Sequence, residues 1–229
     1  VDANIQKICF VGSIASVGDS LQGVPITEEN EWNKEADNSG YAITKFGAEM
    51  EIWRASQEGV EVVVVNPGVI LGSGFWNSGS GKLFSKSAQG FRYYTEGITG
   101  FVGVEDVVNA MMLLMESKVK NERFILVAQN KTYKEVLVAI ADALGTKRPL
   151  RKIFPWQSSI LWRVSALLSK ITGKEPLLSK YSARSAHHIS KYSSEKIKQI
   201  QGFQFTEIDT VISIASMHFL NDAKKERTF

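Results

Sequence analysis

The chain has 229 residues, a formal net charge of +3, and 44% hydrophobic against 22% charged residues, proportions that are ordinary for a globular protein. It has no apolar run long enough to cross a bilayer, no signal-peptide pattern at its start, and a single cysteine, Cys9, inside an apolar strand pattern. These features argue against a membrane-spanning or disulfide-stabilised protein. The default expectation is a cytoplasmic protein in which Cys9 fills the core.

The charge is unevenly distributed along the sequence. Between residues 146 and 184, nine Lys and Arg residues occur with one acidic residue, Glu175, whereas the remainder holds 18 basic and 23 acidic residues. A basic segment on an acidic body indicates an anionic ligand, partner or surface. The alternative is a solvated basic face.

The first elements follow from hydrophobic patterning. Residues 1–5 are expected to end a helix that is already under way. Residues 7–11 (Lys-Ile-Cys-Phe-Val) form an apolar run typical of a strand in a buried parallel sheet. Residues 12–38 form a long polar connection, and connections of this length are usually functional or disordered.

A βαβ unit is predicted next. Ser39 is suited to cap a helix that runs to about Glu58 and is closed by Gly59. Its helically spaced apolar residues predict one buried stripe, made of Ala42, Phe46, Met50 and Trp53. The β-branched run over residues 60–65 predicts a second strand, which ends at Asn66. A strand, a helix and a strand in this order place the helix against a parallel sheet.

The remaining elements are predicted in the same way. Residues 72–100, rich in Gly, Ser and aromatic residues, are expected to form a binding loop with a short helix. The pattern then predicts a strand at 101–104, a helix capped by Asp106 and running to about Ser117, a strand at 123–128, and a helix opened by Thr132 and closed by Gly145. Past Pro149 it predicts helices at 158–171, 179–189, 193–200 and 206–220, followed by a frayed tail over 221–229.

Three side chains suggest chemistry. Ser13 follows the first strand, Tyr41 begins the helix, and Lys45 lies one turn later on the same face. A cation held near a phenol favours the phenolate, and a serine hydroxyl can hydrogen-bond the same substrate oxygen. Such a set moves a proton to or from an alcohol or carbonyl oxygen. It needs a hydride partner, which is a nicotinamide cofactor's role, because no side chain supplies hydride.

Five segments, in order, resemble the extended short-chain dehydrogenase/reductase family, of the NAD-dependent epimerase/dehydratase type. The segments, which cover nearly the whole chain, are residues 10–15, 41–45, 67–72, 101–107 and 192–196 ahead of Gly202-Phe203. The resemblance implies an α/β fold: the C-terminal portion of a Rossmann-like doubly wound parallel sheet plus a smaller, mostly helical substrate-binding region. The dinucleotide-binding part would be residues 1–71 and 101–129, and the substrate-binding part residues 72–100 and 130–229.

The resemblance also implies roles for residues. Tyr41 would be the proton donor and acceptor, Lys45 would hold the cofactor ribose and favour the deprotonated tyrosine, and Ser13 would position the substrate oxygen. The cofactor would be NAD or NADP, with Tyr41 and Lys45 joined in cofactor binding by Pro67, Gly68, Val69 and Ile70. The expected substrate pocket comprises Ser16, Trp76, Lys82 and Phe84, although loop packing or surface exposure fits these four equally well.

No metal site is expected. His187 and His188 are adjacent, so they point apart on a helix, and no acidic or cysteine cluster joins them.

One part of the family's pattern is absent. The family begins with a strand, a Gly-x-x-Gly-x-x-Gly turn and a helix, which bind the cofactor pyrophosphate. The glycine-rich run at 68–74 follows the wrong strand and has no helix start behind it. We therefore expect the sequence to be the C-terminal two-thirds of a longer protein. The residue that distinguishes NAD from NADP, about 20 residues past the turn, would lie outside it.

The motifs also bear on the reaction. The Thr-Asp-Glu of the family's 4,6-dehydratases is Ser13-Ile14-Ala15 here, and the Tyr-Gly of many epimerases is Val17-Gly18. The pattern looks more like the dihydroflavonol-reductase and 3β-hydroxysteroid-dehydrogenase branch, which implies an oxidoreductase that interconverts a carbonyl and a secondary alcohol. The alternatives are a nucleotide-sugar epimerase or a non-catalytic dinucleotide-binding relative.

The expected partners are a small-molecule substrate, hydrophobic or anionic, and a second copy in a homodimer. Nucleic acid is not expected, because the basic segment lacks a recognisable binding module. The amphipathic stretch over 160–171, with Arg163 and Lys170, could lie on an anionic membrane surface. A lid helix packed on the substrate site is the favoured interpretation of that stretch.

Overall fold

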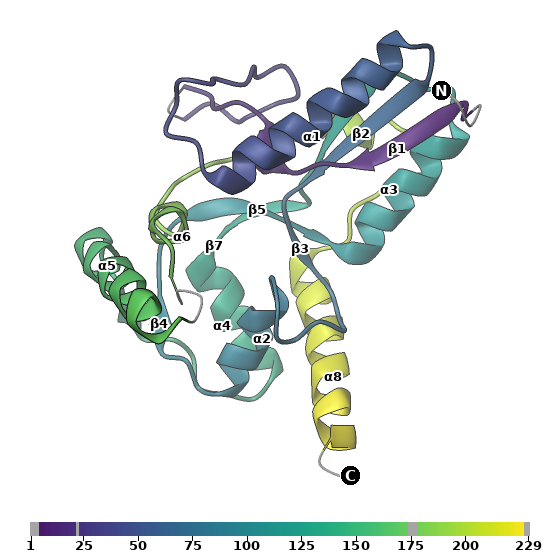
Figure 1. Cartoon of the computed structure of the whole chain (residues 1–229). Helices are drawn as coiled ribbons and strands as arrows, with labels where there is room; N and C mark the ends of the chain where they lie inside the picture. The colour runs from purple at the N-terminus through teal and green to yellow at the C-terminus, as the bar shows by residue number, and fades with distance from the viewer. Residues whose placement is uncertain (1–4, 22, 174–177, 227–229) are drawn as a thin grey trace. The chain divides into compact units, whose positions relative to one another are not determined.

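The computed structural model, shown in Figure 1, describes residues 5–21, 23–173 and 178–226. Residues 1–4 of the predicted helix end and residues 227–229 of the predicted tail lie outside the described residues. The elements mix helices with parallel strand pairs, so the predicted α/β class is confirmed.

The predicted βαβ unit is present. β1 (Lys7–Val11), α1 (Gly40–Gln57) and β2 (Glu61–Pro67) follow one another, and β1 and β2 are parallel. β6 (Glu122–Leu126) pairs in parallel with the other side of β2, which gives the strand order β1-β2-β6.

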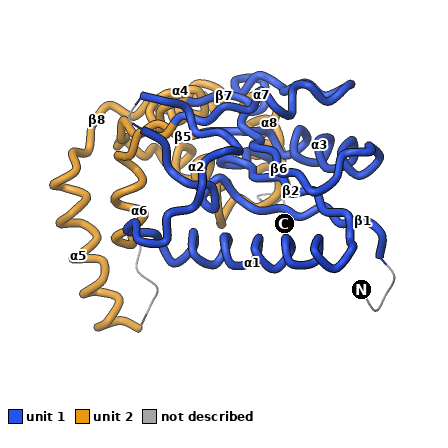
Figure 2. The backbone as a smooth tube through the Cα atoms, turned by 90° about the horizontal axis from the view of Figure 1, so that it is seen from above, with its two compact units in different colours: residues 1–72, 100–130, 191–211 blue, residues 73–99, 131–190, 212–229 orange. Residues whose placement is uncertain are grey.

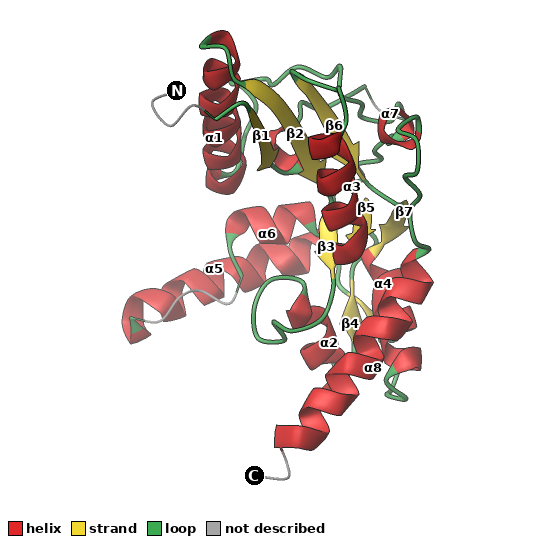
Figure 3. Cartoon of the chain, turned by 90° about the vertical axis from the view of Figure 1, so that its right-hand side faces the viewer, coloured by secondary structure: helices red, strands yellow, loops and turns green. Residues whose placement is uncertain are grey.

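Both faces of this sheet are covered, as parallel sheets require. Alternate residues of β6 point to opposite sides. Phe124 and Leu126 pack in a cluster with α3 (Val104–Glu116), whereas Ile125 packs with Ile14 and Val17 after β1. α1 and α3 lie on the two sides of the sheet in Figure 3.

The ends of α1 are set by local chemistry. The Ser39 hydroxyl accepts a hydrogen bond from the Ala42 N–H at 3.0 Å, which satisfies one of the free donors of the first turn. Gly59, just beyond the helix, has a φ of +95°, a conformation that glycine adopts without strain. Both features were predicted from the sequence.

The predicted buried stripe of α1 is right in part. Ala42 is buried and Phe46 and Trp53 are half-buried, but Met50 is 39% exposed, whereas its neighbour Glu49 has no exposed surface. Glu49 can be buried because it finds several hydrogen-bond donors in the interior, described below.

The chain divides into two compact units, coloured separately in Figure 2. The first comprises residues 1–72, 100–130 and 191–211, and the second residues 73–99, 131–190 and 212–229. Residues 191–211 therefore cluster with the sheet, whereas the sequence boundaries place them in the substrate-binding region.

Besides the sheet, the first unit holds shorter elements. They are η1 (Ile14–Ser16), a 3-10 turn, β3 (Val69–Leu71) and α7 (Glu195–Lys198). β3 pairs in parallel with β5 (Ile98–Gly103), and β7 (Gln129–Thr132) completes that second sheet.

The second unit is mostly helical. Its elements are α2 (Gly81–Ala88), β4 (Tyr93–Tyr94), α4 (Tyr133–Ala143), β8 (Arg151–Lys152), α5 (Pro155–Thr172), α6 (Lys180–Ser185) and most of α8 (Ile208–Glu226). Thr132 and Glu135 form a capping box at the start of α4, as the Thr132 prediction implies.

Two further predictions are corrected. Asp106 does not cap α3, which begins two residues earlier. Its buried carboxylate instead accepts hydrogen bonds from the N–H and hydroxyl of Thr206, at 3.0 and 2.8 Å. The tail is not frayed from Asn221, because α8 continues to Glu226 and Asp222 accepts a bond from the Trp76 indole N–H at 3.0 Å.

Candidate active site

The ends of β1 and β2 are fixed together by hydrogen bonds. The Gly12 N–H donates to the Val65 carbonyl at 2.8 Å, and the Asn66 side-chain amide donates to the Ser13 carbonyl at 3.1 Å. Ser13 then begins the η1 turn, where its hydroxyl accepts from the Ala15 N–H at 3.2 Å. Ser13 is thus held at the carboxyl end of the sheet, where ligands of open α/β sheets bind.

A buried carboxylate ties α1 to these strand ends. Glu49 accepts hydrogen bonds from the Ser16 hydroxyl at 2.7 Å, the Asn66 amide at 2.9 Å and the Trp53 indole N–H at 3.2 Å. The Arg123 guanidinium lies 3.7 Å from Glu49 Oε1, the oxygen that accepts from Trp53. A carboxylate with no exposed surface is stable only with such partners. We call these five residues the Glu49 network.

Gly12 is explained by the same network. A Cβ atom at this position would lie 2.7 Å from the Asn66 amide nitrogen and 3.2 Å from a Glu49 carboxylate oxygen. Only a residue without a side chain lets the strand end approach these groups so closely.

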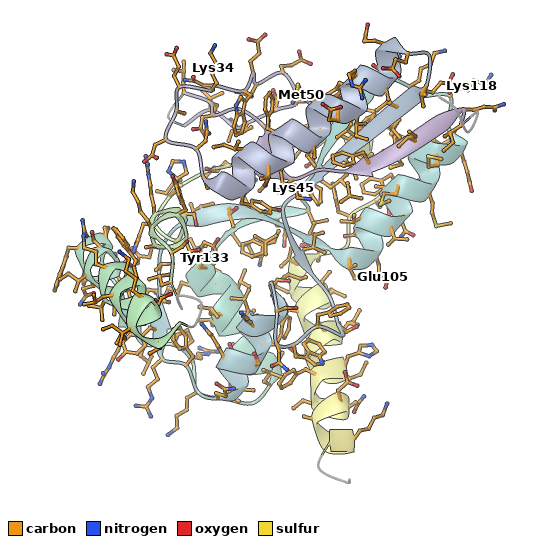
Figure 4. All side chains as sticks on the ribbon, viewed as in Figure 1. Lys34, Lys45, Met50, Glu105, Lys118 and Tyr133 are labelled. Carbon is orange, nitrogen blue, oxygen red and sulfur yellow. The ribbon has the colours of Figure 1, made fainter. Side chains whose placement is uncertain are left out.

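Tyr41 and Lys45 lie on the same helix as Glu49. Tyr41 is in the first turn of α1 and is 58% exposed, and Lys45 is half-buried one turn later. Glu49 follows after one more turn, so the reactive candidates and the buried anchor share one side of α1. In Figure 4, Lys45 and Lys118 lie toward opposite ends of the sheet, with Lys45 at the carboxyl end.

The expected cofactor-contacting segment, Pro67 to Ile70, also begins at this end. Pro67 is the last residue of β2, and the Gly68 N–H donates to the Leu126 carbonyl at 3.0 Å. A Cβ on Gly68 would lie 2.4 Å from the Gly100 carbonyl oxygen, so glycine is required by the close approach of two backbones.

The four expected substrate residues occupy different environments. Ser16 is fully buried in the Glu49 network, and its hydroxyl oxygen also lies 2.7 Å from the Ser13 carbonyl oxygen. Phe84 is fully buried in the second unit, edge-on to half-buried Trp76, while Lys82 on α2 is exposed. Ser16 and Phe84 could reach a substrate only if their surroundings opened. The substrate role of all four stays a prediction.

Other titratable groups lie outside this set. Among the described residues, no group of three or more His, Cys, Asp or Glu side chains is arranged to hold a metal ion. The His187 ring lies 2.8 Å from the Ser158 hydroxyl, and burial, followed by the charge of Lys152, lowers the pKa of His187. Burial raises the pKa of the Cys9 thiol, which packs against the core beside the sheet.

Sequence reasoning missed Glu49, Asn66 and Arg123 as parts of the site. A signal for Glu49 was present, because it lies four residues after Lys45 and therefore on the same helix side. Arg123 carried no such signal, since it reaches Glu49 only through the pairing of β6 with β2.

The parallel sheet, its βαβ unit and the site at its strand ends define a Rossmann-like α/β protein. The family model for the NAD dependent epimerase/dehydratase family matches residues 1–127, and the chain belongs to this family. The predicted family resemblance is thereby confirmed.

Two curated relatives illustrate the range of the family. The chain is 27% identical over 157 residues to sterol demethylase protein B of Methylococcus capsulatus, covering 67% of this chain and 47% of that protein. It is 22% identical over 229 residues to a putative dihydroflavonol 4-reductase of Synechocystis, covering 96% and 66%. The chain thus spans about half to two-thirds of the length of these relatives.

The fold is shared with solved structures. A nucleoside-diphosphate-sugar epimerase from Pseudomonas aeruginosa superposes with a TM-score of 0.76 at 20% identity, covering 94% of this chain and 67% of that one. Structures with the same fold include one complexed with NADPH and one in complex with NAD. At this level of identity the likeness concerns the fold alone.

Removal of the buried carboxylate tests the Glu49 network. Glu49→Ala removes the shared acceptor of Asn66 and Ser16 and the negative charge beside Arg123, so we expect a loss of about 3–5 kcal/mol in unfolding free energy. Ser16→Ala, which removes one donor, is expected to cost about 1–2 kcal/mol. The measurement is urea unfolding of the full-length protein.

Glu51→Ala is the matched control, because Glu51 lies on the exposed side of the same helix and pairs only with Arg54 and solvent in the described structure. It should cost less than about 1 kcal/mol. Equal unfolding midpoints for the Glu49 and Glu51 variants would contradict the network's importance.

The glycine at the strand end gives a second test. Gly12→Ala should destabilise by about 1–3 kcal/mol, because the new methyl group meets buried amide and carboxylate groups. Gly47→Ala on exposed α1 is the control, since no atom lies within 4 Å of the added Cβ. It should be neutral or stabilise by up to about 1 kcal/mol. A Gly12→Ala protein as stable as Gly47→Ala would show that the close approach is not required.

Proposed function

We propose that the protein is an NAD(P)-dependent oxidoreductase that interconverts a carbonyl and a secondary alcohol by hydride transfer. The observation that carries the proposal is the placement of Tyr41 and Lys45 one turn apart on α1, a helix that Glu49 ties to the turn after Ser13 at the carboxyl end of the sheet. The name of one curated relative, the putative dihydroflavonol 4-reductase of Synechocystis, supports it.

Each side chain has a definable task. In reduction, the Tyr41 hydroxyl donates a proton to the carbonyl oxygen, and in oxidation the phenolate accepts it. Lys45 stabilises the phenolate by its charge. Ser13 donates a hydrogen bond to the same oxygen, because its hydroxyl accepts from the Ala15 N–H and keeps its proton for the substrate.

Glu49 is a positioning residue in this scheme. It does not reach the reacting atoms, but its partner Asn66 donates to the Ser13 carbonyl at 3.1 Å, and the Ser16 hydroxyl oxygen lies 2.7 Å from the same carbonyl oxygen. The network therefore fixes the backbone of Ser13 relative to the helix that carries Tyr41. Catalytic groups need such fixed placement, since small displacements cost large factors in rate.

A nicotinamide dinucleotide, when bound, supplies or accepts the hydride. Tyr41, Lys45 and the backbone from Pro67 to Ile70 are the residues of this chain that would contact its nicotinamide and ribose. They fit this role because Tyr41 and Lys45 lie in the first turns of α1 and the Pro67 to Ile70 segment begins at the carboxyl end of β2. Both NAD and NADP remain candidates, in line with the complexes of proteins that share the fold.

The second candidate function is nucleotide-sugar epimerisation. It is favoured by the likeness of the fold to epimerases, including the Pseudomonas aeruginosa protein. The two reactions can be distinguished by whether NAD(P)H is consumed as product forms. An oxidoreductase consumes NAD(P)H in proportion to product, whereas an epimerase converts its substrate with no net change in cofactor.

The decisive experiment uses the full-length protein with a panel of hydrophobic ketones and nucleotide sugars and with both cofactors. We expect ketone-dependent oxidation of NADH or NADPH. Tyr41→Phe and Lys45→Met should each lower kcat by at least about a hundredfold. Because Tyr41 is largely exposed, Tyr41→Phe should leave the unfolding midpoint unchanged.

Lys118→Met is the control for Lys45→Met, because Lys118 is an exposed lysine that precedes β6 and so lies at the amino end of the sheet. It should retain full activity. Turnover that survives Tyr41→Phe would refute the assigned chemistry, and net-neutral conversion of a nucleotide sugar would favour the epimerase.

A further inference from the structure

Helix α5 presents its apolar side to solvent. Seven large apolar side chains of this helix are 49–73% exposed: Trp156, Ile160, Leu161, Val164, Leu167, Leu168 and Ile171. At 100° per residue they fall within an arc of about 140° on one side of the helix. This is the reverse of an ordinary surface helix, whose apolar stripe faces the core.

The opposite side of α5 is polar and is the side that packs. Ser158 and Ser165 are buried. The Ser158 hydroxyl contacts the His187 ring at 2.8 Å, and the Ser165 hydroxyl accepts from the Leu178 N–H at 3.1 Å, so the segment around α6 covers this side. Specific hydrogen bonds therefore hold the helix with its apolar side outward within the second unit.

The charges on α5 are all positive. No acidic residue occurs over residues 155–172, and Arg163 and Lys170, seven residues apart, line one edge of the apolar arc beside Trp156. Arg163 is anchored there by a bond to the Ser159 carbonyl at 2.7 Å and by the Trp162 ring at 4.7 Å. Long cationic side chains at the edge of an apolar arc can reach headgroups while their stems stay in the apolar layer.

We propose that α5 is an interfacial helix that docks the protein on an anionic lipid surface. The apolar arc enters the boundary between headgroups and acyl chains, and Arg163 and Lys170 pair with lipid phosphates. The helix lies on the membrane and does not cross it, in accord with the finding that no helix among the described residues is long and apolar enough to span a bilayer.

The charge pattern favours lipid over a protein partner. The segment from 146 to 184 carries nine basic residues and one acidic residue. Arg148 and Lys152 pair with Asp142 and Glu96 outside the segment, but α5 itself has Arg163 and Lys170 and no acidic residue, so it complements a negatively charged surface. Trp156 and Phe154 are both exposed at the start of α5. Trp is enriched at the membrane–water interface. Trp and Phe both occur on the apolar face of interfacial helices.

Two other roles could account for the exposed apolar arc of α5. It could bind a second copy of the chain, or it could close over the substrate site as a lid. Both predict effects that need no lipid. Burial of α5 between copies gives a dimer that dissociates when the apolar arc is made polar, and a lid gives a raised KM for a water-soluble substrate.

The test is co-sedimentation of the full-length protein with vesicles of phosphatidylcholine, with and without phosphatidylserine, in low salt. It is done without substrate or cofactor, so its outcome does not depend on the proposed reaction. We expect binding to the vesicles that contain phosphatidylserine. The double variant Ile160→Gln/Leu167→Gln should weaken it by at least about tenfold.

Two further variants complete the design. Arg163→Gln/Lys170→Gln should weaken binding to the anionic vesicles by about tenfold or more. Ile214→Gln/Met217→Gln, which changes two exposed apolar residues of α8, is the control and should bind like the unaltered protein. All substituted side chains are exposed, so the fold should persist, as checked by circular dichroism.

The proposal is overturned if the protein does not sediment with anionic vesicles, or if the α5 and α8 variants bind equally. It is also overturned if sizing shows a dimer that only the apolar α5 variant dissociates, or if that variant changes KM without changing vesicle binding.

Discussion

The buried carboxylate of Glu49 is the contact on which the arrangement of the candidate site depends. It is the common acceptor for Ser16, Asn66 and Trp53, and Arg123 lies beside it. The three donors come from the turn after β1, the end of β2 and α1 itself, and Arg123 belongs to β6. One side chain therefore connects α1 with three neighbouring segments, and these partners offset the cost of its burial.

Successive turns of α1 carry the candidate reactive residues and the buried residue that anchors the helix. The helix exposes Tyr41 in its first turn, places Lys45 in the second and fixes its position through Glu49 in the third. In the proposed reaction the exposed phenol of Tyr41 meets the substrate, and the buried Glu49 ties the helix that carries Tyr41 to the turn after Ser13. In the second unit, α5 packs through its polar side, which makes internal hydrogen bonds, and its apolar side is exposed.

The sequence predicts those features that arise from local interactions. β1, β2, the Ser39 cap and the Gly59 terminus of α1 were predictable because strand propensity and helix capping act within a few residues. The burial of Glu49 and exposure of Met50 were not, because helical spacing of apolar residues cannot show that donors from distant strands converge on a carboxylate. Asp106 was misread for the same reason, since its partner Thr206 is 100 residues away.

A double-mutant cycle in kcat, measured on the full-length protein with a ketone that the proposed function predicts it to reduce, tests the central claim most directly. Glu49→Gln is introduced into the unaltered protein and into Ser13→Ala, each variant being checked for folding by circular dichroism. If the Glu49 network acts by placing Ser13, Glu49→Gln lowers kcat in the first background and has little further effect in the second. An equal loss in both backgrounds would contradict the account, because Glu49 would then support activity by a route that does not pass through Ser13.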